Sequence, residues 1–252
     1  MSGGSGLGLP DGMTACLFDV DGVLTETATV HAAAWKEMFD AFLRARADHD
    51  GAPFVAFDEV ADYDRFVDGL PRADGTRSFL GSRGIHLPEG APGDMAGMAT
   101  VQGLGRAKND IVLRRIRTDG VTAYPGSVRF VKAVLAAGLR RAVVSSSANC
   151  AAVLDAAGIA GLFDVRVDGT TVEQDHLAGK PSPDTFLAAA DALGVAPARA
   201  VVFEDALSGV EAGRAGRFGY VVGVDRVGQA EALRAHGADV VVGDLADLLE
   251  PP

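Results

Sequence analysis

Short, continuous apolar runs occur once near the start of the chain and repeatedly along its second half. Runs of this length, each stopped by polar residues, are typical of strands buried on both faces of a parallel sheet. Between them, apolar residues repeat at helical spacing, and glycines often follow. The predicted strands begin at residue 15 and cover 141–147, 163–167, 200–205, 220–224 and 239–242. The predicted helices cover residues 127–137, 149–157, 183–193 and 207–215, with Ser182 expected as an N-cap and Pro183 as the first helical residue.

Residues 28–118 lack strong strand patterns and are predicted to form short helices separated by glycine and proline. The first helix, over residues 28–46, has one apolar and one polar face. The apolar face contains Ala34, Met38, Phe39 and Phe42, and Lys36, Glu37, Asp40 and Arg44 are expected outside. A polar stretch, residues 47–60, is predicted as a long loop or insertion, and a further helix is predicted near residues 106–118.

Strands that alternate with helices indicate an α/β fold with a Rossmann-like, doubly wound parallel sheet. The helical segment interrupts this sheet domain after its first strand, so its two linkers must run side by side. We therefore expect a core domain from residues 13–27 and 119–252 and an inserted helical cap domain from residues 28–118. Such a cap can open and close over the strand ends. Residues 1–12, rich in Gly and Ser, are predicted to be a disordered leader.

The composition narrows the class of protein. The 252 residues are 48% hydrophobic and 23% charged, which is typical of a folded soluble protein. A formal net charge of −11 argues against binding to nucleic acid or to an anionic membrane. The two cysteines, Cys16 and Cys150, lack metal or redox spacing and are expected to be reduced core thiols. With no secretion signal or membrane span, a cytoplasmic protein is expected, and a monomer is the default.

Polar side chains recur where predicted strands end. They are Asp19 and Asp21, Ser145 and Ser146, and Glu204 and Asp205, with Lys180 in a fourth polar element, Gly179-Lys180-Pro181. Ligands of open α/β sheets bind at the carboxyl ends of the strands. Four acids there would repel one another without a cation, and hard oxygen ligands suit Mg²⁺. With Lys180 and the serines, such a cation would bind a dianionic phosphoryl group.

Each element also has an ordinary structural interpretation. Asp-Gly at residues 21–22 is common turn chemistry, and a lone lysine is most often solvated. Glu204-Asp205 could be an acidic pair at a helix N-terminus. Their joint occurrence in this order at predicted strand ends favours the phosphoryl site.

These motifs resemble those of the haloacid dehalogenase superfamily. Residues 18–25, Phe-Asp-Val-Asp-Gly-Val-Leu-Thr, are similar to its first motif; Val144-Ser145-Ser146, Lys180-Pro181 and Phe203-Glu204-Asp205 are similar to the other three. The resemblance implies that Asp19 is the nucleophile, carrying an aspartyl-phosphate, and that Asp21 is the general acid/base. It also implies that Ser145 and Lys180 bind the phosphoryl group. Asp19, Glu204, Asp205 and the Asp21 carbonyl would hold Mg²⁺. Asp21 favours phosphoryl transfer, because true dehalogenases of the superfamily lack this residue.

Further residues resemble the β-phosphoglucomutases of this superfamily. Thr27, His31 and Trp35 match residues that follow their first motif, and residues 68–74 resemble their substrate loop, with Arg72 for the non-transferring phosphate. Lys108 lies in a later cap motif, and Ser146, Ser147 and Asn149 lie in a serine- and asparagine-bearing loop. The sequence departs from the pattern at Pro71, where serine is common, at Glu26, where aspartate is common, and in the longer cap around residues 47–60.

The cap residues also admit structural roles. His31 and Trp35 are one helical turn apart and could simply stack. Arg72 could be an exposed loop charge, and Lys108 could have either a structural or a substrate-binding role. Planar arginine suits bidentate phosphate binding.

The resemblance as a whole implies a mutase of carbohydrate metabolism. It would interconvert β-glucose 1-phosphate and glucose 6-phosphate through phosphorylated Asp19 and a bisphosphate. The nearest alternative is an Mg²⁺-dependent phosphatase acting on a small sugar phosphate, which would use the same core residues but admit water. A non-catalytic phosphosugar-binding protein is a distant alternative, because Asp19, Asp21 and Lys180 are all present.

Overall fold

The structure, a computed structural model, describes residues 6–249. The chain divides into two compact units, one formed by residues up to Thr27 together with those from Val121 onward, the other by Ala28–Gly120. The two linkers between them pair with each other: Thr25 bridges Ala123 in antiparallel fashion, and Glu26 N donates to Thr122 O at 2.9 Å. The linkers therefore run side by side, as an insertion requires.

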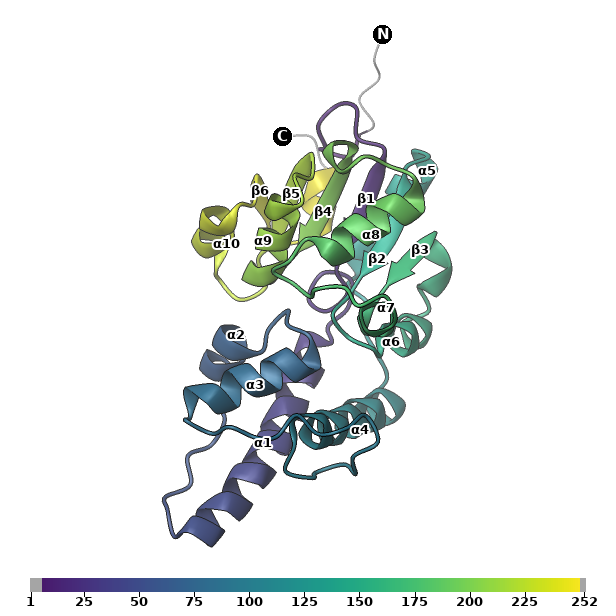
Figure 1. The fold of residues 1–252 in the computed structure, drawn as a ribbon. Coiled ribbons are helices and arrows are strands. Elements are labelled where there is room, and N and C mark those ends of the chain that lie inside the picture. Colours follow the sequence, from purple (N-terminus) through teal and green to yellow (C-terminus); the bar gives the residue numbers. More distant parts are fainter. Residues whose placement is uncertain (1–5, 250–252) are drawn as a thin grey trace. The chain divides into compact units, whose positions relative to one another are not determined.

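A six-stranded, wholly parallel sheet forms the centre of the first unit (Figure 1). Its order is β3-β2-β1-β4-β5-β6, so β1 lies between β2 and β4. The strands are β1 (Ala15–Phe18), β2 (Arg140–Val144), β3 (Val165–Val167), β4 (Ala200–Glu204), β5 (Tyr220–Val224) and β6 (Val240–Val242). Phe18 pairs in register with both Val143 and Phe203, so the strands end together at one edge. The predicted Rossmann-like fold is confirmed.

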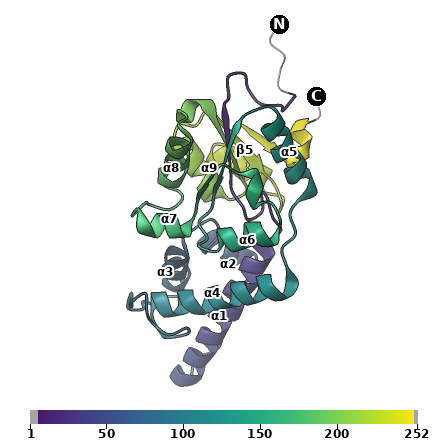
Figure 2. The same ribbon diagram turned by 90° about the vertical axis from the view of Figure 1, so that its right-hand side faces the viewer.

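Helices cover both faces of this sheet (Figure 2). On one face, Phe18 packs against Phe203 and against Phe130 of α5, with ring centroids 4.5 and 6.3 Å apart. On the other face, Leu17 joins a core that includes Phe186 of α8. Because both faces are buried, apolar residues follow one another in the strands, as in β1, where all four residues are apolar and buried. The helices of this unit are α5 (Pro125–Ala136), α6 (Cys150–Ala156), α7 (Gly169–Gln174), α8 (Asp184–Leu193), α9 (Leu207–Ala215) and α10 (Ala230–His236). Three short 3₁₀ helices are η1 (Ala160–Leu162), η2 (Pro197–Arg199) and η3 (Leu245–Leu249).

The second unit consists of helices and loops (Figure 1), and aromatic rings form part of its core. Its helices are α1 (Ala28–Asp50), α2 (Ala61–Phe66), α3 (Arg72–Ser82) and α4 (Val101–Asp119). Phe39 lies at the centre, 5.1 Å from Trp35, 5.3 Å from Phe57 and 4.3 Å from Phe79, between ring centroids. Helix α4 begins five residues before the predicted start because Thr100 caps it, accepting from Gly103 N at 2.9 Å.

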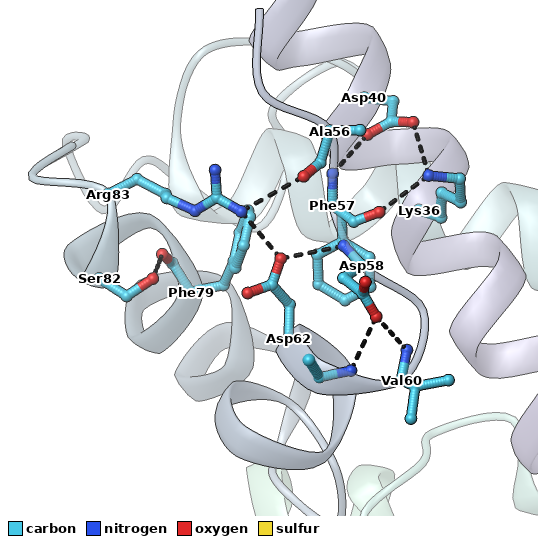
Figure 3. Close-up of polar contacts among 11 residues, drawn as sticks. Lys36, Asp40, Ala56, Phe57, Asp58, Val60, Asp62, Phe79, Ser82 and Arg83 are labelled. Atoms are coloured by element: carbon cyan, nitrogen blue, oxygen red, sulfur yellow. Dashed lines mark hydrogen bonds and ion pairs between the residues drawn. The ribbon is translucent and has the colours of Figure 1, made fainter.

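The predicted exposure of Asp40 is wrong. Asp40 is buried on α1, where its Oδ1 accepts from Phe57 N at 2.8 Å and its Oδ2 lies 3.1 Å from Lys36 Nζ (Figure 3). Lys36 Nζ also donates to Phe57 O at 2.8 Å. Because α1 continues to Asp50, the expected loop at residues 47–60 is shorter, and Phe57 anchors it in the core.

Two other expectations at chain ends and helix starts need correction. Part of the leader predicted over residues 1–12 is ordered: Leu7 is buried and Arg199 Nε donates to Gly12 O at 3.1 Å, while residues 1–5 lie outside the described residues. Helix α8 starts at Asp184, with Pro183 rather than Ser182 at the N-cap. Ser182 Oγ instead donates to Asp184 Oδ1 at 2.8 Å.

Between residues 6 and 249, the helices are too short or too polar to cross a membrane.

Candidate functional site

The sheet register places the predicted acidic residues of the first unit beside one another. Asp19 follows β1 directly, and its N–H extends the ladder by donating to Phe203 O at 3.0 Å. Glu204 is the last residue of the neighbouring strand β4. Ser145 follows β2 on the other side, with its N–H donating to Val167 O at 3.0 Å. All three side chains therefore start from one edge of the sheet.

Lys180 lies between the acidic residues and is almost fully buried. Its Nζ is 2.5 Å from Asp19 Oδ1 and also donates to Glu204 Oε1 and, at 3.4 Å, to Val144 O. Burial alone would lower the pKa of the Lys180 ammonium, but the carboxylates of Asp19 and Glu204 raise it above its ordinary value. Lys180 thus places its ammonium directly beside the nucleophile candidate.

A metal ion would fit beside this ion pair. Carboxylate oxygens of Asp19, Glu204 and Asp205 all lie within 4.8 Å of one another. Burial raises the pKa of the Asp19 carboxyl well above its ordinary value; Lys180 opposes this, and the Glu204 and Asp21 carboxylates add to it. Three carboxylates facing one ammonium leave excess negative charge, which a hard divalent cation such as Mg²⁺ would neutralise. The donor set thus fits the predicted Mg²⁺.

Gly22 allows this cluster to form. Its backbone has φ +81°, and a Cβ on it would lie 1.7 Å from Asp205 Oδ2. A side chain at this position would displace the Asp205 carboxylate. The Asp-Gly sequence at residues 21–22 is therefore a close approach between two site loops as well as a turn.

The Asp21 side chain is held by Thr27, which in turn contacts Thr25. Thr27 Oγ1 donates to Asp21 Oδ1 and lies 2.7 Å from Thr25 Oγ1, which donates to Val20 O at 3.1 Å. Both threonines are buried. Thr27 thus contacts the acid/base candidate directly, while its role toward substrate stays a prediction. Thr25 was not among the predicted site residues, although it is the last residue of the first motif.

The loop after β2 presents its serines as acceptors for its own backbone. Ser147 N donates to Ser145 Oγ at 3.1 Å, and Asn149 N donates to Ser147 Oγ at 3.2 Å. Ser145 is buried, whereas Ser146 and Ser147 are half-buried. Each oriented hydroxyl still has an O–H to donate, which suits a phosphoryl ligand.

The second unit gathers its own polar cluster. Lys108 Nζ lies 2.9 Å from His31 Nδ1 and 4.9 Å from the centroid of the Trp35 ring, and both His31 and Lys108 are buried. Since an ammonium only donates, His31 Nδ1 must accept, which places a ring proton on Nε2. Arg72, the first residue of α3, donates from Nη1 to Asn109 Oδ1 at 2.5 Å. The predicted Arg72, His31, Trp35 and Lys108 thus come from α1, α3 and α4. Asn109, which follows Lys108 in the predicted cap motif, joins them as the partner of Arg72.

Comparisons with known proteins show the family of this chain. A family model described as haloacid dehalogenase-like hydrolase matches residues 13–217. The chain is 57% identical over 246 residues to a β-phosphoglucomutase of Mycobacterium bovis, covering 96% of this chain and 94% of that protein. It is 30% identical to a β-phosphoglucomutase of Bacillus subtilis, covering 94% and 92% respectively. A crystal structure of β-phosphoglucomutase from Clostridium difficile matches with a TM-score of 0.72 and 25% identity, covering 94% and 93%.

The resemblance drawn from the motifs is therefore confirmed, and the isomerase interpretation with it. The chain belongs to the haloacid dehalogenase-like hydrolase family and, within it, to the β-phosphoglucomutases.

Proposed function

We propose that this enzyme interconverts β-glucose 1-phosphate and glucose 6-phosphate through a phosphorylated Asp19. The observation that carries the proposal is the contact of Asp19 with Lys180 at 2.5 Å, within an acidic cluster and two residues before Asp21. A carboxylate is an effective phosphoryl acceptor only where cations neutralise the charge that develops on phosphorus. The strong identity to proteins named β-phosphoglucomutase supports the same reaction.

The reaction would proceed in two balanced transfers. In the first, the O6 hydroxyl of β-glucose 1-phosphate attacks the phosphorus of phospho-Asp19, Asp21 takes the O6 proton, and the Asp19–phosphorus bond breaks. In the second, the bisphosphate presents its C1 phosphate, and Asp19 Oδ attacks that phosphorus. Asp21 returns the proton to the departing O1, which yields glucose 6-phosphate.

The residues around Asp19 and Asp21 would support these transfers. Lys180, with the Ser145 and Ser146 hydroxyls, would bind the phosphoryl oxygens. The hydrogen bond from Thr27 would orient the Asp21 carboxyl toward the sugar hydroxyl. Asp19, Glu204, Asp205 and the Asp21 carbonyl would hold Mg²⁺, which supplies charge neutralisation at the phosphoryl group when bound.

Residues 28–118 would act as the cap and bind the rest of the substrate. Arg72 would bind the non-transferring phosphate, since one edge of its guanidinium is oriented by Asn109. Lys108, His31 and Trp35 form a preorganised polar and aromatic group that would bind the sugar, with Ser147 and Asn149 contributing from the core. Exclusion of water is what would separate a mutase from a phosphatase, because phospho-Asp19 is prone to hydrolysis.

We also propose that the protein works as a cytoplasmic monomer on a small sugar phosphate, without nucleic acid or membrane. The net charge of −11 and two buried free cysteines support this. Light scattering on the purified protein tests the monomer.

A coupled assay tests the reaction. The enzyme receives β-glucose 1-phosphate, Mg²⁺ and a trace of glucose 1,6-bisphosphate, and glucose 6-phosphate and free phosphate are measured separately. Glucose 6-phosphate without phosphate release is expected. Phosphate release without isomerisation would replace the mutase with a sugar-phosphate phosphatase, and absence of both products would contradict turnover of this substrate.

A further inference from the structure

The turn between β5 and α10, residues 225–229, contacts both loops that carry the acidic cluster. Arg226 Nε donates to Gly22 O at 2.8 Å, and Gln229 Nε2 donates to Asp205 O at 3.0 Å. Gly22 adjoins the acid/base candidate Asp21, and Asp205 is one of the three grouped carboxylates. This turn belongs to none of the motifs that define the site.

The turn is itself rigidly built. Asp225 Oδ1 accepts from the backbone N–H groups of Gly228 at 2.7 Å and Gln229 at 2.8 Å, and from that of Val227 at 3.3 Å. Gly228 supplies the positive φ, +83°, that the turn needs. One carboxylate thus fixes the backbone from which Arg226 and Gln229 extend.

The Arg226 side chain is fixed by three further contacts. Its guanidinium lies over the Tyr124 ring, 3.7 Å from the centroid, and Nη1 donates to Gly243 O at 2.8 Å. The same Nη1 lies 3.5 Å from Asp244 Oδ2. A planar fork locked in this way sets where the Gly22 carbonyl lies, which a flexible ammonium would not do equally well.

The two carbonyls that the turn holds belong to residues already in close approach. A Cβ on Gly22 would lie 1.7 Å from Asp205 Oδ2, so a small shift of either loop changes the position of the Asp205 carboxylate. Holding Gly22 O and Asp205 O from one rigid turn therefore sets the spacing of the oxygen donors. Groups that orient metal-binding carboxylates typically change metal affinity about 10- to 100-fold when removed.

We propose that Arg226 and Gln229 are positioning residues that set the Mg²⁺ affinity of the site by holding the Gly22 and Asp205 backbones. The inference rests on the proposed Mg²⁺ site but not on which sugar phosphate reacts. It assigns a function to a chain segment that none of the four superfamily motifs includes.

Calorimetric titration of Mg²⁺ into the metal-stripped full-length protein tests the proposal. Gln229→Ala and Arg226→Lys are each expected to raise the dissociation constant for Mg²⁺ roughly 10-fold. The matched controls Glu231→Ala and Arg234→Lys alter exposed positions on the adjoining helix and are expected to leave it unchanged. In the mutase assay, both turn variants should need more Mg²⁺ for half-maximal kcat, with KM for the sugar phosphate unchanged.

The outcomes separate this inference from the proposed function. If wild type binds Mg²⁺ and the turn variants bind it equally well, the inference is wrong and the mutase proposal stands. A lower unfolding temperature in chelator without any change in Mg²⁺ affinity would show a merely structural turn, and also overturns it. Weaker binding by the turn variants, together with an absence of glucose 6-phosphate from wild type, would support the inference and refute the mutase. Absence of Mg²⁺ binding by wild type would refute the metal site and the inference together.

Discussion

Replacing Lys180 by methionine tests the central electrostatic feature of the site. Met has nearly the same length and fills the buried space, but it removes the only ammonium that contacts Asp19 and Glu204 among the described residues. The side chains of Lys180 and Glu204 are each 1% exposed, so solvent cannot replace the lost charge. The variant leaves two buried carboxylates beside each other without their shared partner.

The expected loss follows from that burial. Removing one partner of a buried ion pair typically destabilises a protein by about 3–5 kcal/mol, because the remaining charge stays desolvated. For a chain of this size, such a loss lowers the unfolding temperature by roughly 6–20 °C. Excess Mg²⁺ should restore part of the loss, because binding to the native acidic cluster stabilises the folded state. Phosphoryl transfer should stay impaired, since Lys180 would also bind the transferring group.

Thermal unfolding followed by circular dichroism, in chelator and again in Mg²⁺, measures both effects. Lys132→Met serves as the control, because Lys132 is exposed on α5 and its loss should leave the unfolding temperature unchanged. An unfolding temperature for Lys180→Met in chelator equal to that of wild type would refute the electrostatic argument. Equal losses with and without Mg²⁺ would refute a cation site at these carboxylates.

Three further predictions concern the nucleophile, the cap and the thiols. Asp19→Asn should lower both glucose 6-phosphate formation and phosphate release by more than roughly 10³-fold; retained turnover would remove Asp19 as nucleophile. Arg72→Ala should lower kcat/KM about 10- to 100-fold, because charged hydrogen bonds to the substrate phosphate are lost. The control Arg117→Ala changes an exposed residue and should leave kcat/KM unchanged. Equal kcat/KM for the two variants would disprove phosphate binding by Arg72. Burial raises the pKa of the Cys16 and Cys150 thiols, so Ellman's reagent should label neither in the native protein up to about pH 9 and both in urea; native labelling would contradict their burial.

Errors in the sequence-based picture arose where local pattern and tertiary contact disagree. Asp40 lies on what looked like the polar face of α1, yet the Phe57 N–H required a buried acceptor there. Leu7 lies in a Gly- and Ser-rich stretch that suggested disorder, but it is buried. In both cases burial in the folded structure outweighed the local composition.

For other features the sequence did not show which residues would meet. Arg226 and Gly22 are 204 residues apart, and nothing around Arg226 distinguishes it from an ordinary turn residue. Asn109 is one polar residue among several on α4 until the structure places its Oδ1 against Arg72. Such pairs become visible only when the fold brings distant elements together.

The sequence by itself determined the element types and the edge at which the acidic residues meet. Continuous apolar runs stopped by polar residues favour strands buried on both faces, and the carboxyl ends of parallel strands share one edge, so Asp19, Ser145 and Glu204 were expected at that edge. Only the tertiary structure decided that Lys180 bridges Asp19 and Glu204, that Gly22 admits the Asp205 carboxylate, and that the turn at residues 225–229 holds both loops. The physical reason is that these contacts depend on register, close packing and side-chain direction, which no local pattern of apolar and polar residues encodes.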